Sequence, residues 1–119
     1  MLLGRYGEAF AAEYLRKKGC RILAMNYRTR LGELDVIAAD RRYVIFAEVK
    51  LRKNAAFAEA REFVTFAKRQ KLAAAAEEWL QKNPQKLQPR FDVIEIYAPD
   101  GLDTIKPDIR HWENAFTRD

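Results

Sequence analysis

Two carboxylates and a lysine lie at a spacing that could bind a metal ion beside a phosphate. Asp35 precedes the triplet Glu48-Val49-Lys50. Residues two apart on a strand point to the same face, so a strand here would put Glu48 and Lys50 side by side. Carboxylate oxygens are the ligands that Mg²⁺ prefers, and Mg²⁺ keeps several waters. A lysine at this place would lie beside the ion and near any bound phosphate.

Periodicity in the first half of the chain predicts the elements that would position these residues. An apolar face that recurs every three or four residues predicts a helix over about Leu2–Lys18, which Gly19 ends. Short runs rich in Ile, Val, Leu, Tyr and Phe then predict strands over Arg21–Arg28, Glu33–Ala39 and Tyr43–Lys50.

The second half predicts one more helix and two more strands. Thr65 is a favourable N-cap for a helix that runs to about Lys82, before Pro84. Strands follow over Arg90–Tyr97 and Ile109–Trp112, whereas residues 114–116 are too few to assign. The order predicts an α/β or α+β domain in which a three-stranded meander is followed by a crossover.

The turn before the third strand predicts the register of the second and third strands. A two-residue Arg41-Arg42 turn would need positive φ at both positions, which arginine disfavours. A four-residue loop over residues 40–43 is easier and pairs Ala39 with Val44.

That register brings the candidate ligands together. Asp35 falls opposite Glu48, and Glu33 falls opposite Lys50, with about 5 Å between the Cβ atoms of each pair. Two opposed carboxylates repel unless a cation or a proton lies between them. The alternative is a surface sheet in which Glu33 and Lys50 form an ordinary cross-strand ion pair.

Composition limits the class of protein. The 119 residues are 49% hydrophobic and 33% charged, which argues against disorder and against a membrane protein. No internal repeat or linker divides the chain, so we expect a single domain over residues 1–119. Cys20 is the only cysteine, which excludes an internal disulfide, and the absence of a signal-peptide pattern favours the cytoplasm. The net charge of +5 permits a polyanionic partner.

The motifs also stand in a recognisable order. Asp35 followed by Glu48-Val49-Lys50 resembles the PD-(D/E)xK motif of the restriction-endonuclease-like superfamily. The whole order resembles the YraN-like family of bacterial proteins, whose fold is similar to archaeal-type Holliday-junction resolvases. The resemblance covers about Gly4 to Phe116, and it implies a central mixed sheet of about five strands flanked by helices. It is carried by Arg5-Tyr6-Gly7-Glu8, Asn26-Tyr27-Arg28, Gly32-Glu33-Leu34-Asp35, Glu48-Val49-Lys50, Lys68 and Arg90-Phe91-Asp92-Val93.

The resemblance implies roles for individual residues. Asp35 and Glu48 would bind Mg²⁺, or Mn²⁺ in its place, and Lys50 would orient the attacking water or stabilise charge on the phosphorane. Glu8 would be the carboxylate that the first helix directs at the metal. The alternative for Glu8 is a carboxylate that interacts favourably with the helix dipole.

The chain departs from the family pattern at two places. Leu51 stands where the family often has Thr or a similar polar residue, and Ala58 stands where Gly usually follows an aromatic residue. The second departure bears on the loop over the site, and neither changes the proposed ligands.

Basic residues near the loops that bound the sheet suit contacts with a phosphate backbone, which do not depend on sequence. Lys68 precedes Leu72 by one helical turn, so it would face the sheet, where we expect it to contact a phosphate or a carboxylate. The alternative for the group is scattered solubilising charge. The predicted nucleic-acid-binding residues are Arg28, Arg30, Arg52, Lys53, Lys68 and Arg69.

Three functions fit these residues. The first is a Mg²⁺-dependent nuclease acting on DNA, including branched DNA. The second is a catalytically silent nucleic-acid-binding module on the same fold, and the third is an RNA nuclease or another phosphodiesterase. A homodimer that cuts both strands is compatible with the first.

Overall fold

The computed structural model describes residues 3–53 and 65–117 and contains two α-helices and five strands in that part of the chain. A short 3₁₀ helix, η2, precedes the last strand. The elements are α1 (Leu3–Lys17), β1 (Arg21–Arg28), β2 (Glu33–Ala39), β3 (Tyr43–Arg52), α2 (Phe66–Lys82), β4 (Gln88–Tyr97), η2 (Gly101–Asp103) and β5 (Asp108–Phe116).

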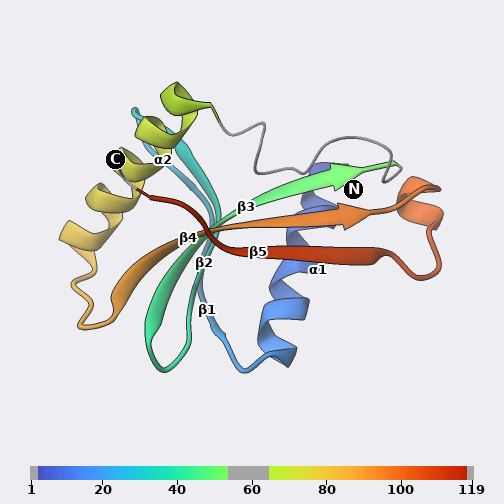
Figure 1. Cartoon of the computed structure of the whole chain (residues 1–119), viewed down its shortest axis with the longest axis horizontal. Coiled ribbons are helices and arrows are strands. Elements are labelled where there is room, and N and C mark those ends of the chain that lie inside the picture. The colour runs from blue at the N-terminus through green and yellow to red at the C-terminus, as the bar shows by residue number, and fades with distance from the viewer. Residues whose placement is uncertain (1–2, 54–64, 118–119) are drawn as a thin grey trace.

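The five strands form one mixed sheet in the order β1-β2-β3-β4-β5. Strands β1, β2 and β3 are antiparallel, β3 and β4 are parallel, and β4 and β5 are again antiparallel (Figure 1). A parallel pair needs a crossover, and α2 lies in the connection between β3 and β4. The predicted α/β class and five-stranded mixed sheet are therefore confirmed, and they are compatible with a restriction-endonuclease-like fold.

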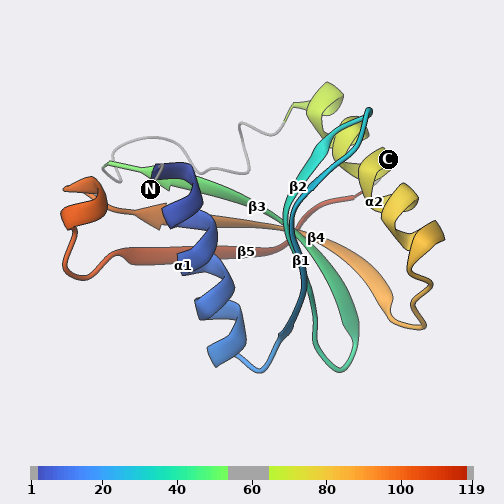
Figure 2. The same ribbon diagram turned by 180° about the vertical axis from the view of Figure 1, so that it is seen from behind.

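The two helices cover opposite faces of the sheet, as Figures 1 and 2 show from the two sides. Ala11 and Leu15 of α1 pack on one face, against Ile45 and other apolar residues of β2, β3 and β4. Leu72, Ala76 and Trp79 of α2 pack on the other face. No helix in the described residues is long and apolar enough to cross a membrane.

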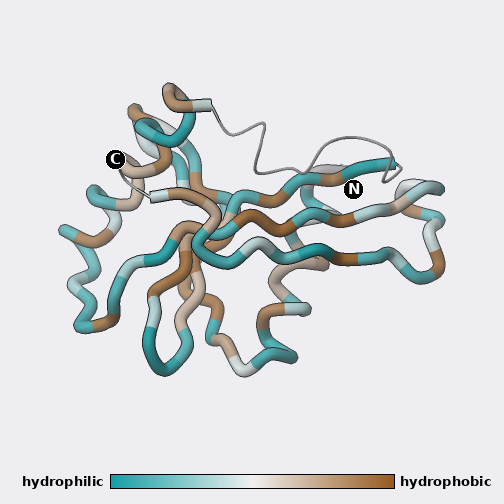
Figure 3. The backbone as a smooth tube through the Cα atoms, viewed as in Figure 1, coloured by the Kyte–Doolittle hydropathy of each residue, from teal (hydrophilic) through white to brown (hydrophobic). Residues whose placement is uncertain are grey.

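Strand β3 lies at the centre of the sheet and is buried on both faces, as its apolar run predicts. Phe46 packs with the α2 side, where its ring meets the Trp79 ring edge-on at 5.9 Å, while Ile45 and Ala47 pack with the α1 side. Figure 3 shows the most hydrophobic segments along these central strands. This double burial continues up to Glu48, which is also buried.

Helix α2 begins where the sequence predicts. The Thr65 hydroxyl accepts the backbone N–H of Lys68 at 3.2 Å, and the helix ends at Lys82 before Asn83. This cap fixes Lys68 in the first turn.

Strand boundaries differ from the predictions mainly at β5, which runs to Phe116 rather than ending at Trp112. Asn114 adopts a positive φ of 51°, and its backbone N–H donates to the Asp92 carboxylate at 2.9 Å. The pairing of β5 with β4 is irregular between Phe91 and Val93, next to this contact. Beyond the irregularity the strand continues, and Phe116 pairs with Phe91.

The turn between β1 and β2 is locked onto α2. The Thr29 hydroxyl oxygen accepts the backbone N–H groups of Leu31 and Gly32, both at 3.0 Å. A Cβ atom added to Gly32 would lie 2.8 Å from the carbonyl oxygen of Lys71. The turn can approach the helix this closely only because residue 32 has no side chain.

We therefore expect Gly32→Ala to lower the free energy of unfolding by about 1–3 kcal/mol, because the turn must move off α2. Gly7→Ala, within α1, is the matched control. A Cβ atom added to Gly7 would lie 3.7–3.8 Å from Val49 and Leu51 of β3, which is ordinary van der Waals contact. That control should be neutral or stabilising by about 0.5–1 kcal/mol. Denaturant unfolding measures both variants, and equal stability of Gly32→Ala and the parent would contradict the packing argument.

Candidate functional site

Asp35 lies where strand alternation fails in β2. Its neighbours Leu34 and Val36 pack on opposite faces, Leu34 with the α2 side and Val36 with the α1 side. Strict alternation predicts that both share a face, and that prediction is wrong at Leu34. On β1, Asn26 has a positive φ of 53° between the pairs Met25–Val36 and Tyr27–Leu34, so both strands are distorted together. Asp35 therefore lies within reach of residues from both helices.

The β2–β3 ladder ends just before Asp35. The predicted pairing of Ala39 with Val44 is confirmed, and the last Cα pair is Val36 with Ala47. The predicted direct pairs of Asp35 with Glu48 and of Glu33 with Lys50 lie beyond this end. The Asp35 Oδ2 atom instead accepts the backbone N–H of Val49 at 2.8 Å. This bond holds the Asp35 carboxylate beside β3.

Glu48 is buried, with 7% of its surface exposed, and it is held by two lysines. The Lys68 Nζ atom lies 2.6 Å from Glu48 Oε1, and the Lys50 Nζ atom lies 3.4 Å from the same oxygen. Lys50 comes from β3 and Lys68 from the first turn of α2. Lys68 therefore contacts a carboxylate, which was one of the two contacts predicted for it.

Glu33 and Lys50 do not form the cross-strand ion pair that was the alternative to a metal site; each pairs with another residue. Glu33 lies 3.5 Å from Arg28, and Lys50 turns to Glu48. Lys50 and Glu48 thus share a face, as alternation along β3 predicts.

Charge in this group is not balanced evenly. Burial and the neighbouring Glu48 carboxylate raise the pKa of Asp35 to about 7. Burial opposes charge on Lys68, but its hydrogen bond to Glu48, its contact with Lys50 and the nearby Glu48 and Asp35 carboxylates together raise the Lys68 pKa. Burial and the adjacent Lys68 lower the Lys50 pKa. Glu48 is thus neutralised by lysines, whereas Asp35 has no full counter-charge.

Glu8 reaches the same group from α1. Burial raises the pKa of Glu8, although hydrogen bonds with Asn26 and Asp35 oppose this change. Its Oε1 atom is buried and has no hydrogen-bond partner in the described part of the chain. A buried carboxylate oxygen without a partner is costly, so this atom is available to water or to a cation.

Asp35, Glu48 and Lys68 line a cavity of about 270 Å³ between α2 and the ends of β2 and β3. Lys68 and Lys71 contribute cations from α2, opposite the carboxylates. The lining residues are Gly32, Glu33, Asp35, Glu48, Lys68, Lys71 and Leu72.

The donor set fits a hard divalent cation in chemistry, although it does not form a closed coordination shell. Within residues 3–53 and 65–117, no three His, Cys, Asp or Glu side chains are grouped to hold a metal ion. Asp35 and Glu48 supply two neighbouring carboxylates, one of them without a full counter-charge. Glu8, whose Oε1 atom has no partner among residues 3–53 and 65–117, hydrogen-bonds with Asp35. An open site of this kind suits Mg²⁺, which keeps several waters.

The other predicted nucleic-acid-binding cations lie outside the lining of this cavity. Arg52 makes an ion pair with the fully buried Glu95 at 3.3 Å, so its contact is with the sheet. Arg69 lies over the Phe66 ring on α2, at 5.9 Å. Arg30 and Lys53 are exposed. Arg28 is also exposed and pairs with Glu33, which itself lines the cavity.

Of the two departures from the family pattern, Leu51 packs against the α1 side of the sheet. Its side chain therefore faces away from the Glu48 side of β3, and an apolar residue suits that place. Ala58 lies outside the described residues.

Sequence reasoning missed two contributors to the site. Asn26 distorts β1 and hydrogen-bonds with Glu8, and Lys71 lines the cavity. The available signal for Asn26 was its residue type, since asparagine tolerates positive φ better than most residues. The helical pattern gives no such signal for Lys71, because it favours a solvated helix face at that residue.

A second polar group supports the sheet away from this cavity. Arg90 donates two hydrogen bonds to the buried Asp92, at 2.8 and 2.9 Å, and the two side chains form a structural ion pair. His111 Nε2 lies 2.7 Å from Asp92, and Tyr14 of α1 contacts His111 Nδ1 at 3.0 Å. Burial would raise the Asp92 pKa, but the bonds from His111, Arg90 and Asn114 lower it.

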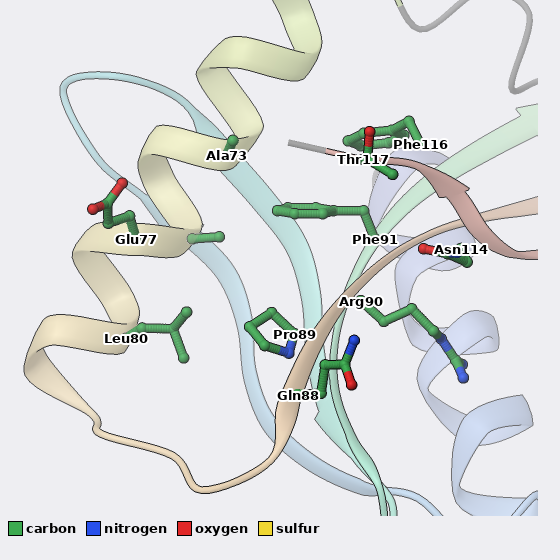
Figure 4. Close-up of a pocket in the computed structure, with 11 residues that line it drawn as sticks. Ala73, Glu77, Leu80, Gln88, Pro89, Arg90, Phe91, Asn114, Phe116 and Thr117 are labelled. Atoms are coloured by element: carbon green, nitrogen blue, oxygen red, sulfur yellow. The ribbon is translucent and has the colours of Figure 1, made fainter. Parts of the chain in front are cut away.

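A larger cavity, of about 390 Å³, lies between α2 and the β4–β5 pair (Figure 4). Its walls include Leu80, Phe91 and Phe116, and Glu77 is the one carboxylate among the described residues that line it. The Arg90 side chain points away from α2 in this view, and it donates a hydrogen bond to Asp92. The cavity therefore lacks the paired carboxylates that distinguish the smaller one.

Comparison with known proteins places the chain in a family. The model described as "Uncharacterised protein family UPF0102" matches residues 7–96. The chain belongs to the UPF0102 family. This confirms the predicted YraN-like relationship, and the matched residues include Glu8, Asp35, Glu48, Lys50 and Lys68.

UPF0102 relatives cover nearly the whole chain. A UPF0102 protein of Geotalea daltonii is 44% identical over 115 residues, which are 96% of this chain and 88% of that protein. Another, of Clostridioides difficile, is 42% identical over 114 residues, 95% of each chain. A third, of Caldanaerobacter subterraneus, is 40% identical over 116 residues, 96% of this chain and 93% of that protein.

The raised pKa of Asp35 makes stability depend on pH. Protonated Asp35 suits the folded site, so its stabilising contribution is present below about pH 4 and is lost as the pH rises to about 7. Asp35→Asn should therefore stabilise the protein at pH 8, by on the order of 1–2 kcal/mol after discounting for partial exposure, and should change little at pH 4.

Thermal unfolding at the two pH values measures this difference. Asp103→Asn, at an exposed carboxylate of η2, is the control and should shift Tm little at either pH. A stabilisation by Asp35→Asn that is equal at both pH values would contradict the assignment of the raised pKa to Asp35.

Proposed function

We propose that this UPF0102 protein is a metal-dependent nuclease that hydrolyses phosphodiester bonds in DNA, including branched DNA. One observation carries the proposal: Asp35, Glu48 and Lys68, from three separate elements, line one cavity, and Lys50 pairs with Glu48 beside it. Asp35 and Glu48 come from β2 and β3, and Lys68 comes from α2. A sheet needs no such group for stability, since a buried pair of like charges is costly.

Each residue has a role in the proposed reaction. Asp35 and Glu48 would hold Mg²⁺ or Mn²⁺, and the bound ion would polarise the phosphate and lower the pKa of water. Lys50 would donate hydrogen bonds to the attacking water or to a phosphate oxygen, which stabilises developing negative charge. Glu8 Oε1 would accept a hydrogen bond from water held beside Asp35, since it has no hydrogen-bond partner among the described residues.

Charge around the cavity supports a nucleic-acid substrate. Lys68 and Lys71 line it, and Arg28 and Arg30 lie on the adjoining β1–β2 hairpin. The net charge of the chain is +5. Cations beside a cavity raise the local concentration of a polyanion and contact its phosphates regardless of sequence.

A catalytically silent nucleic-acid-binding module is the second candidate. The 2.6 Å ion pair between Lys68 and Glu48 favours it, because one of the two ligands is already neutralised without a metal. Such a module would keep salt-sensitive binding and show no metal-dependent cleavage.

Cleavage of a substrate panel tests the choice. Single-stranded, duplex, flap and four-way DNA, with matched RNA, should be incubated with Mg²⁺, Mn²⁺ or EDTA. We expect metal-dependent cleavage of DNA that the double variant Asp35→Asn/Glu48→Gln abolishes, because it removes both charged ligands with little change of shape. DNA binding by this variant should persist or tighten, since two negative charges near the phosphate are gone.

Glu13→Gln, at an exposed carboxylate of α1, is the control and should cleave like the parent. Cleavage by the double variant at the parent rate would end the assignment of the reaction to these residues. Cleavage of RNA alone would move the assignment to the third function.

Binding should also depend steeply on salt. Each phosphate that a cation neutralises releases condensed counterions, so DNA affinity should fall strongly between about 50 and 200 mM salt. Arg30→Gln should reduce the magnitude of the slope of log affinity against log salt concentration by about one. Arg16→Gln, near the far end of α1, should leave this slope unchanged. Fluorescence anisotropy measures these slopes. If the affinity of the parent did not depend on salt, the proposal that the cations beside the cavity contact phosphates would be wrong.

A further inference from the structure

Two ammonium groups share one oxygen of Glu48. Lys68 lies at 2.6 Å and Lys50 at 3.4 Å from Oε1, so two positive charges face one buried negative charge. One lysine is enough to neutralise Glu48. The second is in excess for this carboxylate, and its place beside a metal-ligand candidate needs a separate explanation.

The two lysines differ in how freely they can leave. Lys50 lies on β3 two residues from Glu48, in register with Glu95 of β4, and 26% of its side chain is exposed. Lys68 reaches across the cavity from the first turn of α2, and 39% of its side chain is exposed. A flexible four-carbon stem lets an ammonium group on a helix move without moving the helix. Release of Lys68 leaves Glu48 still paired with Lys50.

A divalent cation and the Lys68 ammonium group cannot both lie against Glu48 at this distance. Like charges a few ångströms apart in a poorly solvated site repel strongly. A cation held by Asp35 and Glu48 would therefore displace Lys68. The cavity that Lys68 lines is where the proposed function puts the substrate phosphate.

We propose that Lys68 is an internal counter-ion that couples metal binding to nucleic-acid binding. Without a divalent cation it neutralises Glu48, and when the cation binds it is released to contact a substrate phosphate. This inference rests on the proposed function and adds a coupling to it. Because such coupling is reciprocal, metal should strengthen DNA binding through Lys68, and DNA should strengthen metal binding.

Metal binding alone gives the first test. Isothermal titration with Mn²⁺ should compare the metal-free parent, Lys68→Gln and Lys71→Gln, after circular dichroism shows equal folding. We expect Lys68→Gln to bind Mn²⁺ on the order of tenfold more tightly, because the competing charge is gone. Lys71→Gln removes the same charge from the same wall of the cavity and should change affinity much less. Lys68→Arg keeps the competing charge and should bind like the parent.

The outcomes separate this inference from the proposed function. Mn²⁺ binding by the parent that Lys68→Gln does not tighten, or that both glutamine variants tighten equally, overturns the inference alone. Failure of the parent and of Lys68→Gln to bind Mn²⁺ overturns both.

DNA binding gives the second test, with a readout that does not require cleavage. Affinity for a DNA strand should be measured in EDTA and at saturating Ca²⁺, with the strand checked on a gel to be intact. The gain in affinity on adding Ca²⁺ should be several-fold larger for the parent than for Lys68→Gln. On adding Ca²⁺, the slope of log affinity against log salt concentration should also steepen for the parent, by the amount expected for about one more phosphate contact. Equal gains for the two proteins overturn the inference, and Lys71→Gln should gain as much as the parent.

Discussion

The candidate site depends on one unfavourable interaction, the approach of the Asp35 and Glu48 carboxylates at the point where β2 separates from β3. Burial makes each charge costly, and proximity adds repulsion. The structure offsets this cost with the Val49 N–H on Asp35 and with two lysines on Glu48. The offset is incomplete at Asp35, whose pKa rises to about 7. The proposed cation would supply the counter-charge that Asp35 lacks.

The sequence predicts much of the fold because its signals are local. The Thr65 cap, the positions of β1 and β2 and the pairing of Ala39 with Val44 all follow from residue types within a few positions of one another. The extension of β5 to Phe116 does not, because it depends on a contact between Asn114 and Asp92 on another strand. Long-range side-chain contacts of this kind leave no periodic pattern in the chain.

The site was predictable to the extent that alternation holds. Glu48 and Lys50 share a face on a regular strand, and they meet as expected. Asp35 lies at a break in alternation that depends on Asn26 across the β1–β2 pair, so the reach of Glu8 could come only from the resemblance. The Lys68–Glu48 contact depends on how α2 packs on the sheet. A helical pattern predicts which face of the helix Lys68 lies on, but not which residue of the sheet it contacts.

The parallel pairing of β3 with β4 has a consequence for how the chain folds. The hairpin of β2 and β3 closes through a short loop, so it brings Asp35 near Glu48 by local contacts. Lys68 comes from the crossover, which must close a long loop, and this step is slow by comparison. Until α2 docks, the hairpin holds its carboxylates without the Lys68 charge. We therefore expect the site to form in two stages, with Lys50 beside Glu48 from the hairpin onward and Lys68 added when α2 docks.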